Sequence, residues 1–114
     1  MDDTFTLYDL KVEVVGEESS FVCSHHTGDS FLVEGENLVF PAGARFSMYA
    51  LAAILPLLPA KERPLDAHDW MLSDAEIACP DPNCGARFRI SRVGRRVLSH
   101  GACTVVPLAD ETKE

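Results

Sequence analysis

The sequence predicts an α+β fold, in which a small antiparallel sheet packs on one central apolar helix and a zinc-ribbon-like C-terminal hairpin follows. Several short segments alternate apolar and polar residues, one longer segment is apolar on nearly every side, and two Cys/His pairs flank a segment of hairpin length. The 114 residues suit a single domain. We expect the sheet and central helix in residues 1–78, the knuckle and hairpin in 79–108, and an acidic tail in 109–114.

The first strand is expected at residues 4–15. Its second half carries an apolar side chain at every other position, which defines one face: Tyr8, Leu10, Val12 and Val14. Phe5 and Leu7 are out of phase with that face. A β-bulge near Leu7-Tyr8 would restore the phase, because a bulge inserts one extra residue into the pairing.

Shorter strands are expected after this one, separated by turn residues: 21–23, 30–34, 37–40, 76–78, 86–93, 97–99 and 104–108. Gly35-Glu36 predicts a tight hairpin turn, and Gly94-Arg95 predicts another turn. Residues 65–73 are expected to be irregular or to form a single helical turn.

Residues 44–55 form the one long helix that the sequence predicts. Pro56 is expected to end it, and the later prolines to keep the next residues out of regular helix, because proline lacks an amide donor and clashes with the preceding turn. A helix that is apolar all round is buried on every side or faces a partner. One small sheet covers only one side, so we expect a protein partner or a homo-oligomer at Tyr49, Leu51 and Leu55.

The C-terminal third contains two ligand pairs in the spacing C-x4-C-x15-H-x2-C: Cys79, Cys84, His100 and Cys103. A structural Zn²⁺ takes four N or S donors in a tetrahedron, and two short turns joined by a hairpin supply that geometry. Cys79-Pro80 and Cys84-Gly85 are typical of zinc-ribbon knuckles, although a ribbon usually has two residues between its cysteines. The sequence therefore predicts a closed, structural zinc site with these four ligands.

A second group of donors lies upstream, in Cys23-Ser24-His25-His26. If this loop folds next to the knuckle, Cys23 or His26 replaces one of the two C-terminal donors. The simpler alternative is that Cys23 and Cys103 are small buried apolar residues, as free cysteines often are.

A small metal- or thiol-dependent enzyme is the alternative function, with the candidate residues Cys23, His25, His26 and Cys79. Adjacent residues rarely reach the geometry of a nucleophile and its base, because the base must approach the thiol from across a cleft. The sequence contains no recognisable acid–base pair, phosphate-binding loop or nucleotide fingerprint. It therefore favours a non-catalytic role.

The net charge of −8 argues against binding to nucleic acid or to an anionic membrane, since both need a basic surface. Five of the ten Lys and Arg residues nevertheless lie within residues 87–96. Arg87 and Arg89 share one face of the predicted strand. They form either an ordinary solvated face or a fork that binds the carboxylates of an acidic partner.

The N-terminus lacks the basic and apolar regions of a signal peptide, and the apolar run at 46–60 is shorter than the ~20 residues that span a bilayer. We therefore expect a cytoplasmic protein without membrane contact. In that reducing compartment cysteines are thiols or metal ligands more often than disulfides.

Three segments resemble an uncharacterised family of small bacterial α+β proteins: Leu7-Tyr8-Asp9-Leu10, Tyr49-Ala50-Leu51-Ala52-Ala53-Ile54-Leu55-Pro56-Leu57-Leu58-Pro59-Ala60-Lys61 and Ala78-Cys79-Pro80-Asp81-Pro82. The resemblance runs from about Leu7 to Arg92. It implies that Cys23 and Cys79 recur, whereas the other predicted ligands need not. It also implies that genes of some members accompany those of prenylated-flavin-type aromatic-acid decarboxylases. The function expected from sequence is thus a zinc-stabilised accessory or partner-binding subunit of a metabolic enzyme assembly.

Overall fold

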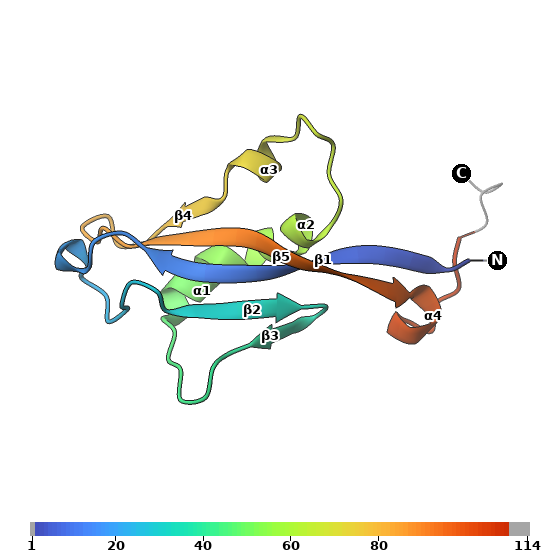
Figure 1. The fold of residues 1–114 in the computed structure, drawn as a ribbon, viewed down its shortest axis with the longest axis horizontal. Coiled ribbons are helices and arrows are strands. Elements are labelled where there is room, and N and C mark those ends of the chain that lie inside the picture. The colour runs from blue at the N-terminus through green and yellow to red at the C-terminus, as the bar shows by residue number, and fades with distance from the viewer. Residues whose placement is uncertain (1, 110–114) are drawn as a thin grey trace.

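A computed structural model describes residues 2–109 and shows an α+β fold built on one five-stranded antiparallel sheet (Figure 1). The strands are β1 (Thr4–Val15), β2 (Ser30–Glu34), β3 (Asn37–Val39), β4 (Glu76–Ala78) and β5 (Arg87–Ser99). Their order across the sheet is β3-β2-β1-β5-β4, so the two longest strands lie side by side at its centre. The predicted α+β class with an antiparallel sheet is confirmed. Residues 110–114 of the predicted acidic tail lie outside the described residues.

A β-bulge explains why β1 changes phase. The register between β1 and β5 shifts between Asp9 and Leu10. Leu7 and Leu10 are both buried, although strict alternation would place residues three apart on opposite faces. A bulge is therefore present two residues after the predicted position, but the extra residue is Val93 of β5 and not a residue of β1, because Asp9 pairs with Gly94 and Leu10 pairs with Arg92. The predicted turn at Gly94-Arg95 is wrong, because Gly94 pairs with Asp9 inside one continuous strand.

Two segments predicted as strands have other conformations. Residues 21–23 form a loop beyond the 3-10 turn η1 (Glu18–Ser20). Residues 104–108 do not pair back on the sheet, since the single helical turn α4 (His100–Cys103) redirects the chain and places His100 Nε2 2.6 Å from the carbonyl oxygen of Val106. The described residues 79–108 therefore contain no zinc-ribbon hairpin.

The helical segment is shorter than predicted and lies on one face of the sheet, behind it in Figure 1. Helix α1 (Met48–Ile54) begins after Ser47, whose hydroxyl oxygen accepts a hydrogen bond from the Ala50 amide. Only Ala50 and Ile54 of α1 are buried, and Met48 and Tyr49 are each 74% exposed. Of the two alternatives given for an apolar helix, burial on every side is therefore wrong for α1, and the expected partner stays a prediction.

The chain stays helical beyond Pro56, contrary to the prediction. It passes through the 3-10 turn η2 (Leu55–Leu57) into α2 (Leu58–Glu62), and a proline occupies the first turn of each. Proline is tolerated there because first-turn amides have no partner within the helix. A further single turn, α3 (Trp70–Ser73), falls in the segment predicted to be irregular or single-turn.

The core forms where alternate residues of the central strands meet α1 and α2. Its largest fully buried side chains are Phe31, Phe88, Leu10, Ile54, Val12 and Val14. This packing positions the loops at the end of the sheet where β1 ends and β5 begins. None of the described helices has the length and hydropathy needed to cross a membrane.

Candidate metal centre

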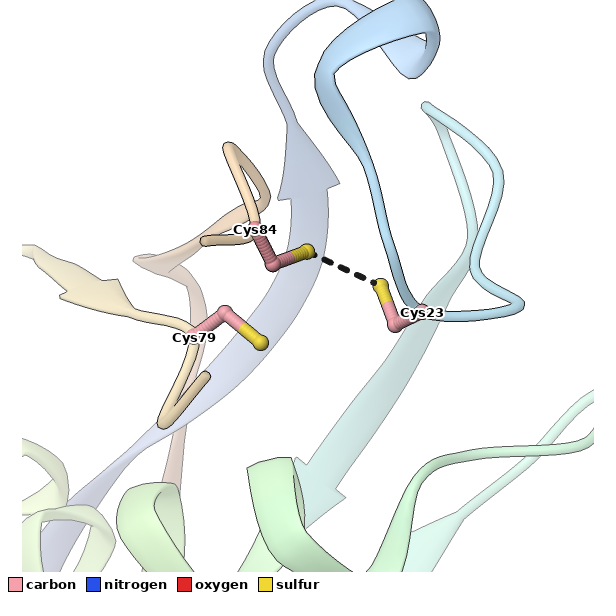
Figure 2. A group of neighbouring side chains, drawn as sticks. All are labelled: Cys23, Cys79 and Cys84. Atoms are coloured by element: carbon pink, nitrogen blue, oxygen red, sulfur yellow. Dashed lines mark hydrogen bonds between the residues drawn. The ribbon is translucent and has the colours of Figure 1, made fainter. Parts of the chain in front are cut away.

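Three cysteines from two distant segments meet at one end of the sheet (Figure 2). Cys23 lies in the loop between η1 and β2, while Cys79 follows β4 and Cys84 precedes β5. Their Sγ atoms all lie within 4.8 Å of one another, and those of Cys84 and Cys23 are 3.5 Å apart. A disulfide requires about 2.05 Å, so the three side chains are free thiols turned toward a common space.

The turn between β4 and β5 holds Cys79 and Cys84 close together. The Cys79 amide donates to the carbonyl oxygen of Ala86 (3.2 Å), and the Cys84 amide donates to that of Asp81 (3.0 Å). The Asp81 carboxylate accepts from the Asn83 amide at 2.9 Å, which tightens the turn. These contacts are local, so the C-x4-C spacing was sufficient to predict this half of the site.

The loop that carries Cys23 is attached to this turn by its backbone. The Gly85 amide donates to the carbonyl oxygen of Ser20 (2.8 Å), and the Val22 amide donates to Cys84 Sγ (3.2 Å). Gly85 is needed for this approach, because a Cβ there would lie 2.0 Å from Ser20 Oγ and 2.7 Å from Ser20 Cβ. The two segments are thus in contact through main-chain atoms.

The backbone amide two residues further on lowers the pKa of each thiol by favouring its ionised form. These amides belong to His25 for Cys23, Asp81 for Cys79 and Ala86 for Cys84. Amide donors stabilise the thiolate, which is the form that binds metal ions. The cluster therefore has the knuckle geometry expected of a thiolate metal site, repeated at three sulfurs.

The pKa values show which sulfur is ionised first. Burial favours the neutral thiol of Cys84, but the amides of Cys23, Ala86 and Val22 outweigh it and lower the pKa of Cys84 to about 6. Burial raises the pKa of both Cys23 and Cys79. The free protein at neutral pH thus holds one thiolate beside two thiols, and a bound cation would displace the remaining protons.

Three sulfur donors at these distances suit a soft metal ion. Zinc binds thiolates at about 2.3 Å, which places the sulfurs of a tetrahedral site about 3.8 Å apart. A groove of about 670 Å³ adjoins the cluster and is lined by Cys23, Cys79, Ser47, Tyr49 and Asp81, among others. The described cluster contains three donors, two of which line this groove, so a tetrahedral ion would need a fourth ligand from outside the cluster.

The predicted ligand set is divided by the fold. Cys79 and Cys84 are together, but His100 and Cys103 lie beyond the other end of β5, twelve residue steps or roughly 40 Å away. The prediction that His100 and Cys103 bind the same ion as Cys79 and Cys84 is therefore wrong. The physical reason is that residues 87–99 form one extended strand instead of a hairpin.

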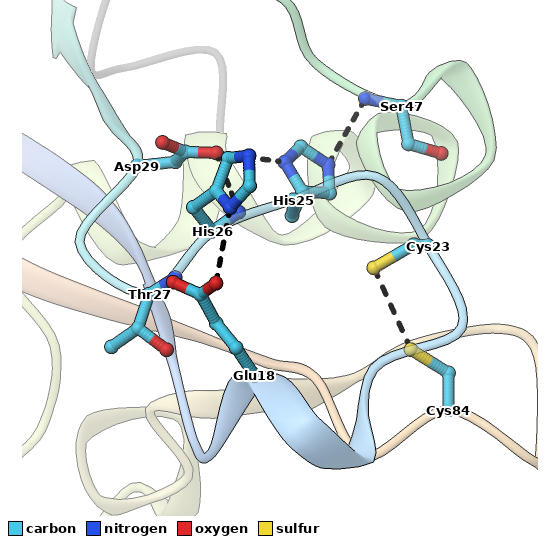
Figure 3. A network of polar contacts seen from close by, with 8 residues as sticks. All are labelled: Glu18, Cys23, His25, His26, Thr27, Asp29, Ser47 and Cys84. Atoms are coloured by element: carbon cyan, nitrogen blue, oxygen red, sulfur yellow. Dashed lines mark hydrogen bonds and ion pairs between the residues drawn. The ribbon is translucent and has the colours of Figure 1, made fainter.

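Neither imidazole of the upstream loop belongs to the three-sulfur cluster (Figure 3). His26 is a surface residue whose Nδ1 lies 3.1 Å from a carboxylate oxygen of Glu18. His25 is buried; its Nε2 accepts from the Ser47 amide (3.1 Å), and its Nδ1 lies 3.6 Å from an Asp29 oxygen. His25 thus connects this loop to the start of α1, and His26 does not replace a sulfur ligand.

The residues predicted to bind a partner differ in exposure. Tyr49 is 74% exposed and Leu55 41%, whereas Leu51 is half-buried against the core. Arg87 and Arg89 are exposed on one face of β5, as predicted. Arg89 is hydrogen-bonded to the Glu76 carboxylate on β4 at 2.9 Å, so its guanidinium already has an acidic partner.

Comparisons of the chain with protein-family models, curated proteins and solved structures gave no match. The assignment of the site therefore depends on the side chains themselves. Sequence reasoning considered Cys23 only as an alternative ligand, and the structure gives it the place assigned to the distant pair. Two sequence signals had pointed to Cys23: its place in the upstream donor group, and the expectation from the resemblance described above that Cys23 and Cys79 recur.

Proposed function

We propose that this protein is a non-catalytic accessory domain that binds Zn²⁺ through Cys23, Cys79 and Cys84 and uses the adjoining surface to bind a partner subunit. The observation that carries the proposal is the convergence of three sulfurs within 4.8 Å, each supplied with a backbone amide donor. Soft thiolates select zinc, copper(I) or iron–sulfur clusters. Zinc is proposed because it needs no redox partner and accepts isolated thiolate sites.

The metal would cross-link two segments that are far apart in sequence, the Cys23 loop and the β4–β5 turn. The Cys23 loop has no strand pairing of its own. It meets the β4–β5 turn through one backbone–backbone hydrogen bond, from Gly85 to Ser20, and one hydrogen bond from the Val22 amide to Cys84 Sγ. Metal–thiolate bonds would add most of the remaining attachment, since binding free energy at such sites contributes directly to folding. They would also fix one wall of the groove beside the cluster.

The proposed partner surface is the exposed start of α1 next to this groove. Met48 and Tyr49 line the groove with Pro80, and both project well into solvent. Aromatic residues and methionine are enriched at protein interfaces. We propose a subunit of a metabolic enzyme assembly as the partner, with a prenylated-flavin-type aromatic-acid decarboxylase as the first to test because of the sequence resemblance, and a second copy of the chain as the other arrangement.

The metal site is tested by a matched pair of cysteine substitutions. We expect one zinc per chain in the wild type and in Cys103→Ser, because Cys103 is exposed and distant from the cluster. Cys84→Ser is expected to bind no zinc and to melt on the order of 10 °C lower. Native mass spectrometry and thermal unfolding of the zinc-reconstituted proteins measure both. Retention of one zinc by Cys84→Ser would refute the proposed ligand set.

A second candidate function, a metal-dependent enzyme, is favoured by one observation. Three protein donors leave a fourth position for a ligand from outside the cluster, and catalytic zinc sites hold a water there. Cobalt substitution separates the two functions, because visible d–d bands report the coordination shell. Bands that shift with added azide or imidazole indicate an exchangeable ligand and favour the enzyme. Bands that do not respond indicate a closed shell and favour the accessory domain.

A further inference from the structure

A second groove lies between the β2–β3 hairpin, α2 and the end of the sheet next to α4, and its lining includes Cys103 but none of the three clustered cysteines. We call it the Glu62 groove. Its volume is about 760 Å³, and its apolar walls come from Phe5, Leu7, Leu55, Leu58, Pro59 and Leu98. This volume is within the range of small-molecule sites, which combine apolar walls with a few polar groups.

Glu62 is a buried acid in the wall of this groove. The residue is only 5% exposed, and its Oε2 has no hydrogen-bond partner among the described residues. Buried carboxylates are normally paired, because an unpaired one loses its hydration without replacement. Burial accordingly raises the pKa of Glu62, although the nearby charge of Arg63 opposes the rise. Oε2 is thus an acceptor without a donor, covered by protein atoms just behind the wall of the groove.

The basic groups near the groove have partners elsewhere. Arg96 forms a bidentate pair with Asp9, with nitrogen–oxygen distances of 2.6 and 3.2 Å. Arg63 donates to the carbonyl oxygen of Pro59 at 2.8 Å. Two further acids, Glu34 and Glu36, stand on the hairpin side of the groove. The carbonyl of Pro59 is neutral, so the lining charges without an oppositely charged partner within residues 2–109 are the Arg63 guanidinium and the three acids Glu34, Glu36 and Glu62, and this excess of acids disfavours a carboxylate or phosphate ligand.

We propose that the Glu62 groove binds a primary amine with an apolar body. The Glu62 side chain turns toward the groove, so that Oε2, which is covered in the ligand-free structure, accepts from the ammonium, and the body packs against Leu7, Leu58 and Leu98. An ammonium supplies both the missing donor and the missing positive charge, whereas a hydroxyl supplies only the donor. The same chemistry is present in a free aliphatic amine and in a lysine side chain. The proposal does not depend on the metal site, because the lining of the groove includes none of the three clustered cysteines.

Titration of the full-length, zinc-loaded protein with n-hexylamine tests the proposal, with amide chemical shifts in NMR as the measurement. We expect saturable shifts at groove residues such as Gly35, Leu98 and Ala102, and affinity about tenfold or more above that of hexanoate. Nα-acetyl-lysine methylamide identifies the source: comparable affinity indicates a lysine side chain, and much weaker affinity indicates a free amine. Absence of saturation, or shifts confined to the cysteine end, would overturn the proposal.

Two isosteric substitutions distinguish the contribution of the buried Glu62 to amine affinity from that of the other negative charges in the groove. Glu62→Gln is expected to weaken hexylamine binding by about tenfold or more, because it removes the charge that pairs with the ammonium. Glu36→Gln removes the same charge from an exposed position in the same lining and is expected to change affinity less than about twofold. Equal weakening by both, or none by Glu62→Gln, would overturn the proposal. The hexylamine shifts in the wild type are decisive even if a variant fails to fold.

Discussion

At Glu62, the cost of burying a carboxylate should be visible in the pH dependence of stability. Burial raises the pKa of this side chain above its ordinary value of 4.5. Between that value and the higher pKa of the folded chain, the folded protein holds a proton that the unfolded protein has lost. The free energy of unfolding from this group therefore falls as the pH rises through that interval and stays low above it.

Replacing Glu62 with glutamine should stabilise the ligand-free protein. We expect the free energy of unfolding at neutral pH to rise by about 1 kcal/mol, since a neutral amide loses less on burial than an unpaired carboxylate. The gain over the wild type should shrink as the pH falls toward 4.5. Urea denaturation at several pH values measures both effects, with the exposed Glu36→Gln as control. A gain that is independent of pH would contradict this account of Glu62.

The β4–β5 turn and the η1 loop meet at a contact that leaves no room for a side chain. Gly85→Ala would put a Cβ within 3.0 Å of two side-chain atoms of Ser20. Because the Gly85 amide also bonds the Ser20 carbonyl, the two segments must move apart to accept it. We expect a loss of about 1–3 kcal/mol in the free energy of unfolding, together with weaker zinc binding.

Gly101→Ala is the matched control for this glycine. Gly101 lies in the helical turn α4, and a Cβ there would approach no atom closer than 3.5 Å. Alanine favours helix over glycine, so this variant should unfold like the wild type or slightly later. Denaturation curves and competitive zinc titration compare the two variants. If Gly85→Ala keeps wild-type stability and zinc affinity, the close approach of the two segments is not required for the site.

Across the molecule, the effect of metal removal should be confined to one end. The cysteines join the Cys23 loop to the β4–β5 turn, while the far halves of β1 and β5 are held by their own pairing and by the Asp9–Arg96 ion pair. Chelation is expected to reduce amide protection in residues 21–29 and 79–86 by about tenfold or more, and to leave residues 95–99 unchanged. Hydrogen exchange with mass spectrometry measures this. A uniform loss of protection would show that the metal instead supports the whole fold.

A substitution at the exposed start of α1 should weaken association with a partner without affecting folding. Tyr49 is 74% exposed, so Tyr49→Asp should leave zinc content and melting temperature close to those of the wild type. Its association with the partner subunit or with a second copy should fall by about tenfold or more, as for an aromatic interface residue. Native mass spectrometry and binding titration measure this, with Tyr49→Phe as control. Undiminished association in Tyr49→Asp would place the interface elsewhere.

Several parts of the fold followed from local rules. Alternation predicted β1 and the β2–β3 hairpin, and the phase change between Leu7 and Leu10 predicted a bulge. Cys79 and Cys84 are five positions apart, so their turn also needed only local information. Predictions from local sequence were wrong at residues that are compatible with two different conformations. Gly94 suits both a turn and a bulge, and Pro56 suits both a helix end and a new first turn.

The amino-acid sequence alone thus determines where most strands form, that Cys79 and Cys84 share a turn, and that the protein is acidic. Side-chain alternation and turn chemistry depend on only a few neighbouring residues, and the net charge depends on composition alone. Only the tertiary packing determines which third cysteine lies beside Cys79 and Cys84, and which carboxylate is buried without a hydrogen-bond donor. Cys23 is 61 residues from Cys84, and Glu62 is enclosed by strands from both ends of the sequence. Such proximity arises only when the sheet closes and α2 packs against it, and no short-range pattern encodes it.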